Sequence, residues 1–224
     1  MIELKQLTIG WELRDVDLVL QKGKIYGLLG PSGSGKNTLM KSIVGLVKPK
    51  AGKVLINNAP IGEETKKVVA YISSETSFYP YMTLEDVGEY FDYFYEDFSV
   101  DKYEKMIDKM NLYMGSQVKE LSLEQATKHK VAVMLSRDAQ LYILDEPFSG
   151  IDIIERDRIL EAIREVANEE KTFIISSYLV DVLESLVDDV VFLNAGNVAL
   201  KGAVEDIKVE HRKSIVELYK EIYA

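Results

Sequence analysis

The sequence predicts a mixed α/β fold, in which a core sheet carries an N-terminal antiparallel β subdomain and an inserted α-helical subdomain. Three observations predict this arrangement. A glycine-rich stretch at residues 30–38 separates an apolar, strand-like run from a helix-like run. Two earlier runs, at residues 2–9 and 13–20, alternate apolar and polar side chains as half-buried strands do. The segment at residues 84–135 instead repeats its apolar positions at helical spacing.

The remaining elements follow from local patterns along the chain. The two alternating runs predict a pair of antiparallel strands ahead of an apolar strand at residues 25–29. Short apolar runs predict further buried strands at residues 53–58, 68–72, 140–144 and 172–177. Helices are expected at residues 155–170 and 180–187, a hairpin at residues 190–200, and one or two surface helices in residues 203–224.

The helical insert, residues 84–135, divides a predicted core of residues 1–83 and 136–224 within a single domain of 224 residues. The insert contains an aromatic cluster that we interpret mainly as its own core. An exposed part of this cluster would instead form a groove for a partner's helix. The cluster consists of Tyr90, Phe91, Tyr93, Phe94, Tyr95 and Phe98.

The composition excludes several classes of protein. Apolar residues make up 47% of the chain, which allows a substantial core, and the absence of cysteine excludes disulfides and thiolate metal sites. No apolar run reaches the roughly 18 residues that a membrane-spanning helix needs, and no signal-like segment is present. A net charge of −10 weighs against nucleic-acid binding. We therefore expect any membrane attachment to occur through a protein partner.

The glycine-rich stretch has the context of a phosphate-binding P-loop, because a strand precedes it and a helix follows it. Glycines allow the backbone N–H groups to face one centre, the helix N-terminus adds partial positive charge, and Lys36 adds a full charge. The alternative is a glycine-rich turn that binds nothing. The predicted binding residues are Gly30, Pro31, Ser32, Gly33, Ser34, Gly35, Lys36, Asn37 and Thr38.

One position of this loop departs from the usual pattern. The residue after the lysine is normally Ser or Thr, whose hydroxyl holds Mg²⁺ beside the phosphates, and here it is Asn37. An amide oxygen can ligate Mg²⁺, but it lies one atom further out and must fit a tight octahedron. Thr38 cannot simply replace it, since one helical step turns a side chain by about 100°. The sequence thus predicts nucleotide binding more firmly than a well-built metal site.

Trp11 is the only tryptophan, and it lies at the predicted tip between the first two strands. We consider two roles for it: stacking on an adenine ring, or covering the edge of the core. Further along, Asp145 and Glu146 directly follow a short buried strand. Carboxylates at this end of a core strand lie where an open α/β sheet binds its ligands.

Four segments occur in an order and at a spacing that resemble the ATP-binding subunit of ABC transporters over essentially the whole chain. They are the P-loop, Leu121-Ser122 ahead of an apolar helix, residues 141–147, and the loop at residues 149–152. The resemblance implies a P-loop NTPase core, with ATP and Mg²⁺ as cofactors. It also implies two ATP-binding subunits that sandwich the nucleotides, as a homodimer or a heterodimer. A transmembrane permease subunit would hold them at the inner, cytoplasmic face of the membrane.

The resemblance also assigns roles to single residues. Asp145 is similar to the acidic residue that holds Mg²⁺, and Glu146 to the general base that polarises the attacking water. Lys36 would belong to the same catalytic apparatus, because phosphoryl transfer depends on positioning and charge neutralisation. The alternative for Glu146 is a strand-end carboxylate with a structural partner.

The departures from the family pattern fall on functional positions. The signature reads Leu121-Ser122-Leu123-Glu124-Gln125, where Ser122 can still cap a helix aimed at ATP but two glycines are lost. Glu124 would place a negative charge near a triphosphate unless its side chain turns away. Tyr178 stands at the position of the switch histidine and can donate one hydrogen bond. Ser74 stands where the family has a metal-binding glutamine, with Glu75 beside it. We assign no catalytic role to the histidines, His129 and His211.

We therefore expect an ATP-binding subunit that couples ATP binding and slow hydrolysis to export by a separate membrane subunit. The alternative is a degenerate regulatory or assembly subunit that hydrolyses little and pairs with an active ATPase. A soluble ATPase of this family that acts on DNA or ribosomes is less favoured, because the chain has neither a second cassette nor a long coiled-coil insert.

Overall fold

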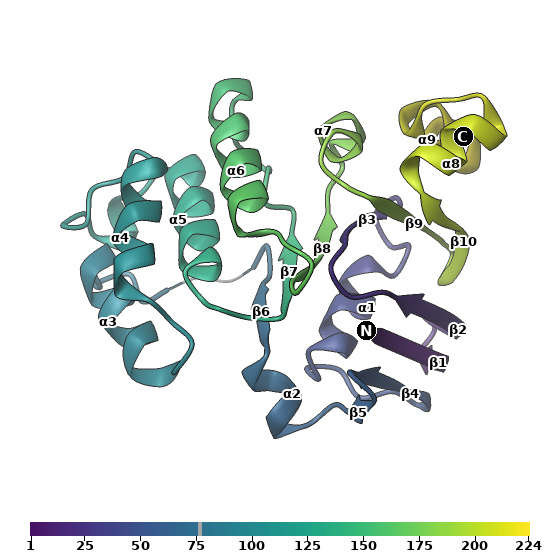
Figure 1. Cartoon of the computed structure of the whole chain (residues 1–224), viewed down its shortest axis with the longest axis horizontal. Coiled ribbons are helices and arrows are strands. Elements are labelled where there is room, and N and C mark those ends of the chain that lie inside the picture. The colour runs from purple at the N-terminus through teal and green to yellow at the C-terminus, as the bar shows by residue number, and fades with distance from the viewer. Residues whose placement is uncertain (76–77) are drawn as a thin grey trace.

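The computed structural model describes residues 1–75 and 78–224 and contains two sheets (Figure 1). The smaller sheet is antiparallel, in the order β2-β1-β4-β5. Its strands are β1 (Ile2–Ile9), β2 (Leu13–Leu20), β4 (Ala51–Ile56) and β5 (Ala59–Pro60). The predicted pairing of the first two strands is confirmed, with Ile2 opposite Leu20 and Ile9 opposite Leu13.

The larger sheet has the order β10-β9-β3-β8-β7-β6, and only its β9–β10 pair is antiparallel. Its strands are β3 (Ile25–Leu29), β6 (Val69–Ile72), β7 (Leu141–Asp145), β8 (Thr172–Ser176), β9 (Asp189–Asn194) and β10 (Asn197–Ala203). The central strands are continuous apolar runs because both faces of this sheet are covered. Because β3, β6, β7 and β8 run parallel, their carboxyl ends meet along one edge of the sheet.

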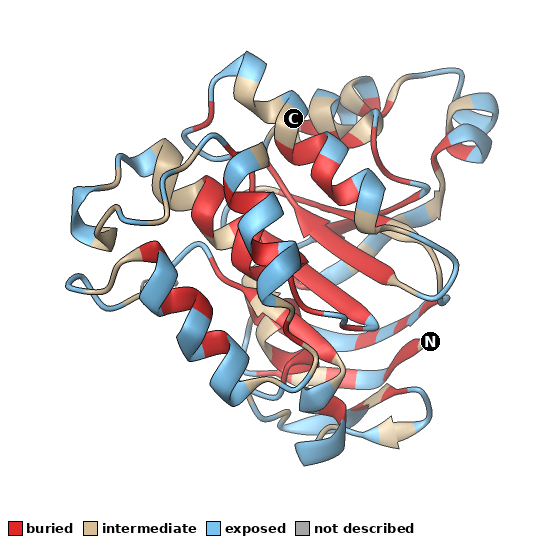
Figure 2. Cartoon of the chain, turned by 60° about the vertical axis from the view of Figure 1, so that its left-hand side comes forward, coloured by how far each residue is buried: buried red, intermediate tan, exposed pale blue. Residues whose placement is uncertain are grey.

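Alternate residues of the central strands face two different cores. In β7, Ile143 belongs to a cluster shared with α1 (Lys36–Ile43) and the antiparallel sheet. Its neighbours Tyr142 and Leu144 belong to a second cluster, shared with the other helices. Figure 2 shows that buried residues concentrate along the strands and on one face of the helices. A packed cluster on each face of the core sheet therefore fixes the position of the edge where the carboxyl ends of its parallel strands meet.

Between β6 and β7 the chain forms helices, which lie together beside the core sheet (Figure 1). They are α3 (Leu84–Phe94), α4 (Val100–Lys109), the short 3₁₀ helix η1 (Val118–Glu120) and α5 (Leu123–Leu135). The three longer helices each begin at a Ser or Thr N-cap, which accepts a hydrogen bond from a free N–H group of the first turn. The predicted aromatic core is right for Phe91 and Phe98, whereas Tyr95 is half-buried and Tyr90, Tyr93 and Phe94 are exposed.

Arg137 joins this helical insert to the core sheet. Its guanidinium forms two hydrogen bonds to Asp97 of the insert, at 2.9 and 3.0 Å. The same group donates to the backbone oxygens of Val69, at 2.8 Å, and Lys67, at 3.0 Å. It also lies 4.1 Å from the centre of the Tyr95 ring. A single buried cation therefore fixes the insert against the start of β6.

The other helices complete the core. They are α2 (Glu63–Lys67), α6 (Ile153–Val166), α7 (Val180–Glu184), α8 (Val204–His211) and α9 (Ile215–Tyr223). The predicted helix at residues 155–170 is shifted, because the Asp152 side chain accepts from the N–H groups of Ile154 and Glu155 and starts α6 earlier. It ends at Val166 because Ala167 is extended. Across residues 1–75 and 78–224, every helix is too short or too polar to span a bilayer.

Candidate active site at the ends of the core strands

The carboxyl ends of four neighbouring parallel strands bring the predicted site residues together. The P-loop follows β3, Ser74 follows β6, Asp145 ends β7 and Tyr178 follows β8. Asp145 lies opposite Ser176 in the β7–β8 register. Ligands of open α/β sheets bind at this edge.

The P-loop needs its glycines for two reasons. Gly30, Gly33 and Gly35 have φ of 155°, 78° and 103°, which favour glycine. In addition, a Cβ at Gly30 would lie 2.5 Å from Ser34 Oγ, and one at Gly35 would lie 2.7 Å from a methyl carbon of Leu13. The loop is thus wrapped around the start of α1 and packed against the β1–β2 turn.

Lys36 is held inside the loop and is 8% exposed. Its Nζ donates to the backbone oxygens of Gly30, at 2.6 Å, and Pro31, at 3.1 Å, and lies 4.8 Å from the centre of the Tyr178 ring. Burial lowers the pKa of Lys36, which the carboxylates of Glu146 and Asp145 partly oppose. Both hydrogen-bond acceptors of this ammonium are neutral carbonyl oxygens, so an anion such as a phosphate would bind it more strongly.

Asp145 and Ser74 are in direct contact, and both were predicted as metal ligands. The Oδ2 atom of Asp145 accepts from Ser74 Oγ at 3.0 Å and from the Ser74 N–H at 3.3 Å, and Oδ1 accepts from Ser176 Oγ at 2.7 Å. The third predicted ligand, Asn37, has a buried Oδ1 that lacks a hydrogen-bond partner among the described residues. Carboxylate, hydroxyl and amide oxygens suit a hard cation such as Mg²⁺.

Glu146 has one engaged and one free carboxylate oxygen. Oε2 accepts from the Tyr178 N–H at 3.2 Å, whereas Oε1 is buried and has no partner within the described part of the chain. Burial raises the pKa of Glu146, and the hydrogen bond from Tyr178 acts in the opposite direction. A cavity of about 80 Å³ lined by Glu146 and Asp145 leaves room for at least one water. Oε1 itself is shielded from solvent, so a water in the cavity lies next to the glutamate but is not shown in contact with this oxygen.

Ser122, predicted as a helix cap that points at a nucleotide, does cap α5. Its Oγ accepts from the Gln125 N–H at 3.2 Å, and its own N–H donates to Gln125 Oε1 at 2.9 Å. For Glu124 the structure shows the exception named above, a side chain that turns away. Its carboxylate turns toward Lys128 and the Asp152 N–H instead.

Trp11 lies at the β1–β2 turn and is 72% exposed, so the alternative that it covers the core is wrong. Its neighbour Glu12 was not predicted as a site residue, yet its Oε2 accepts from Thr38 Oγ1 at 2.8 Å. The backbone oxygen of Glu12 also lies 2.9 Å from where a Gly35 Cβ would be. The turn that carries Trp11 therefore lies against the P-loop helix.

Tyr223 of α9 supports the P-loop, whereas His129 lies away from the site. Tyr223 donates to the Leu193 backbone oxygen at 2.8 Å, and this oxygen would lie 2.6 Å from a Gly30 Cβ. No sequence signal indicates this support of the P-loop by α9. His129 instead lies in the helical insert, where its Nε2 is 2.8 Å from the Tyr103 hydroxyl and burial lowers its pKa to about 3.

Comparisons with known proteins agree with this geometry. The ABC transporter family profile matches residues 13–149. The ABC transporter ATP-binding protein NatA of Bacillus subtilis is 28% identical over 212 residues, which cover 89% of this chain and 85% of that protein. The manganese transport system ATP-binding protein MntB of Listeria innocua is 28% identical, with 94% and 93% covered.

Solved structures share the fold. One, described as an ATP-binding subunit of an ABC transporter, superposes with a TM-score of 0.89 at 29% identity and covers 99% of this chain and 98% of its own. A dimeric ATP-binding cassette bound to ADP and phosphate reaches 0.81 at 20% identity, with 91% and 98% covered, and shows the fold alone. The chain belongs to the ABC transporter family and is an ATP-binding subunit with the P-loop ATPase domain of that family.

Proposed function

We propose that this chain binds ATP with Mg²⁺ and couples binding and slow hydrolysis to export by a separate membrane subunit. One observation supports the proposal above all: the buried Lys36 ammonium in its glycine-rich loop lies within electrostatic reach of the Glu146 carboxylate, whose Oε1 accepts no hydrogen bond from the described residues. Lys36 and Glu146 are two of the groups that phosphoryl transfer to water needs from the protein, a cation for the phosphates and a base for the water.

Different residues would bind the phosphates, the adenine and the Mg²⁺ ion. The P-loop N–H groups and Lys36 would hold the phosphates, and Trp11 would stack on the adenine from the exposed turn. Asp145, with Ser74 hydrogen-bonded to it, and Asn37 would hold Mg²⁺, which supplies positive charge to the phosphate oxygens. The buried, unpartnered Asn37 Oδ1 supports this set. Ser122 would face the nucleotide of the paired subunit.

Calorimetry with ATP and Mg²⁺ tests the proposal on the intact chain. We expect heat of association with one ATP bound per chain. Absence of binding at concentrations that saturate related ATP-binding subunits would contradict it. A second titration, with ATP and EDTA, separates the phosphate cradle from the metal ligands, because only the latter need Mg²⁺.

Slow hydrolysis follows from the residues that replace the usual ones. The Asn37 amide oxygen lies further from the backbone than a hydroxyl, and Tyr178 offers only one neutral hydroxyl where the family has histidine. Tyr178 also places its ring over Lys36, which a γ-phosphate must approach. Glu124 does not contribute, since its charge is paired with Lys128.

We expect the substitution Asn37→Ser to raise Mg²⁺-dependent hydrolysis by about tenfold, because even changes in the residues that orient metal ligands alter activity by about 10–100-fold. The hydroxyl would lie at the distance that the Mg²⁺ octahedron favours. Phosphate release at saturating ATP measures the change. Asn168→Ser, at an exposed position after α6, is the matched control and should leave the rate unchanged. A rate for Asn37→Ser equal to that of the control would remove Asn37 from the explanation.

The pH dependence of hydrolysis should report Glu146. Because burial raises its pKa above the ordinary 4.5, the carboxylate becomes protonated at a higher pH than a free glutamate. A protonated base cannot accept a proton from water, so the rate should fall as pH falls, with a midpoint above 4.5. A pH–rate profile at saturating ATP checks this. A rate that stays flat down to the pKa of an exposed glutamate would contradict the assignment.

A cavity of about 390 Å³ supports docking to a membrane subunit. It opens between the end of α1 and the helical insert, and Phe78, Phe91 and Met134 contribute to its apolar lining. A cytoplasmic helix of a membrane partner would fill it, as groove-bound helices do. This partner would hold the chain at the inner face of the membrane. One similar structure is described as an ABC exporter, and it shares only the fold at 19% identity.

The alternative function is a regulatory or assembly subunit that binds ATP and pairs with an active ATPase. The contact of Tyr178 with Lys36 and the amide at position 37 favour it, whereas the free oxygen of Glu146 disfavours it. Neighbouring reading frames that encode an apolar multi-span protein and a second cassette with an intact signature would support a heterodimer. A membrane protein without a second cassette would support a homodimer.

A further inference from the structure

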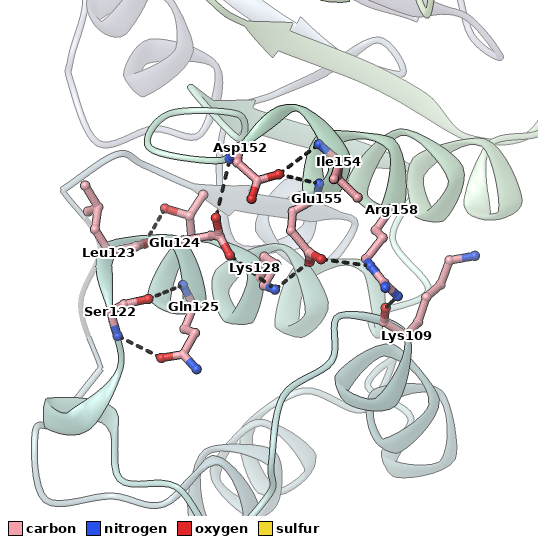
Figure 3. A network of polar contacts seen from close by, with 11 residues as sticks. Lys109, Ser122, Leu123, Glu124, Gln125, Lys128, Asp152, Ile154, Glu155 and Arg158 are labelled. Atoms are coloured by element: carbon pink, nitrogen blue, oxygen red, sulfur yellow. Dashed lines mark hydrogen bonds and ion pairs between the residues drawn. The ribbon is translucent and has the colours of Figure 1, made fainter.

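The starts of α5 and α6 lie side by side, and each has its own cap (Figure 3). Ser122 caps α5, and Asp152 caps α6 through its side chain. Between them lies a chain of charges that the ATPase chemistry described above does not use. It runs from Glu124 through Lys128 and Glu155 to Arg158.

Lys128 is the centre of this chain of charges. Its side chain is 4% exposed, and its Nζ lies 2.6 Å from Glu155 Oε2 and 3.6 Å from Glu124 Oε1. Glu155 Oε1 in turn lies 3.1 Å from Arg158 Nε. The Lys128 ammonium holds the pKa of Glu155 below its usual value. Two cations and two carboxylates alternate, so the group is neutral and its buried ammonium is paired.

Glu124 connects this group to the loop between β7 and α6. Its second oxygen accepts from the Asp152 N–H at 3.4 Å. Thr127, one turn along the same helix, has its hydroxyl 3.4 Å from the Ser149 backbone oxygen, but its single proton has a closer acceptor in the Leu123 backbone oxygen at 3.0 Å. The Ser149 N–H donates to the Glu146 backbone oxygen at 3.1 Å. Contacts from α5 therefore reach the middle and the far end of the loop that begins at Glu146, and the loop's own Ser149–Glu146 hydrogen bond links them to Glu146.

Glu146 depends on such support because its backbone is strained. Its φ is 52°, a left-handed conformation that few residues other than glycine adopt. Such a conformation persists only where the surrounding structure imposes it.

We propose that Glu124 is a positioning residue, which uses the Asp152 N–H and Lys128 to hold the loop of residues 146–152, and with it Glu146, against the first turn of α5. The inference deepens the proposed function, because it rests on Glu146 as the base. It also explains how a glutamate is accommodated at this point of the signature: its charge is taken up within the chain.

Amide exchange of the Asp152 N–H in the intact, nucleotide-free chain tests the tie directly. Glu124→Ala should speed this exchange by about tenfold, the loss of one hydrogen bond. Glu124→Gln keeps an acceptor but no charge, so it should have a smaller effect. Both variants should fold, since Lys128 keeps Glu155 as its partner. Glu169→Ala, at an exposed site after α6, is the control. Exchange at Asp152 that matches the control would overturn the proposal.

Turnover tests the link to Glu146. Glu124→Ala should lower kcat by about threefold to tenfold and leave the affinity for ATP unchanged, because the P-loop is intact. Faster exchange with unchanged kcat would overturn the link. If Glu146→Gln itself kept wild-type turnover, the base role would fail, and the exchange result would still decide whether Glu124 holds the loop.

Discussion

Glu146→Gln is expected to lower the rate of ATP hydrolysis by about 100–1000-fold, within the range that a general base contributes. Glutamine keeps the shape and can still accept from the Tyr178 N–H, but its amide cannot take a proton from water. ATP binding should persist, because the contacts of Lys36 and the P-loop do not involve Glu146. Single-turnover phosphate release and calorimetry measure the two effects separately.

Two observations guard this result against misinterpretation. Burial raises the pKa of Glu146, so the neutral amide removes a desolvation cost and the variant should be no less stable than the wild type. Glu104→Gln, on the exposed side of α4, is the matched control and should keep the wild-type rate. Equal hydrolysis by Glu146→Gln and this control would show that another group activates the water.

Arg137→Met is expected to lower the free energy of unfolding by about 3 kcal/mol, the lower end of the cost of breaking a buried ion pair. The loss leaves Asp97 without its cation and the backbone oxygens of Lys67 and Val69 without a donor. We use the lower end of the range of destabilisation because the Asp97 side chain is 25% exposed, so water partly solvates its carboxylate when the arginine is lost. Urea unfolding monitored by circular dichroism measures the change.

Companion variants identify the cause of this loss. Arg137→Lys keeps a charge but not the paired geometry with Asp97, so it should be destabilised too. Adding Asp97→Asn to Arg137→Met should recover part of the loss, because the unpaired carboxylate is then removed. The control, Arg14→Met, replaces an exposed arginine of β2. A change in Arg137→Met below about 1 kcal/mol would class the pair with weak surface salt bridges.

The P-loop and the acidic pair were predictable because short stretches of sequence specify them. Three glycines and one lysine between a strand and a helix are typical of a phosphate-binding loop. Two carboxylates that directly follow an apolar strand are expected at the carboxyl edge of the sheet, where α/β proteins bind ligands. The cap at Ser122 was predictable for the same reason, since Ser and Gln three residues apart form a capping box. These positions could thus be predicted from neighbouring residues alone, without knowledge of tertiary contacts.

Other parts of the site depend on contacts between distant segments. Thr38 meets Glu12 only because the β1–β2 turn folds onto the P-loop, and Tyr178 covers Lys36 only because β8 and β3 are neighbours. The Glu124 side chain has one partner that is close in sequence and one that is distant. Lys128 at i+4 is a partner that sequence spacing suggests, whereas the Asp152 N–H comes from another helix. The sequence patterns contain no information on such packing.

The single exposed tryptophan gives this protein a built-in optical probe. Since no other indole is present, emission excited at the red edge of aromatic absorption arises from Trp11 alone. Base stacking would quench that emission, so nucleotide titrations need no dye or label. If the base stacks on Trp11 as proposed, the same signal ranks guanine and cytosine nucleotides against adenine and reports base preference directly.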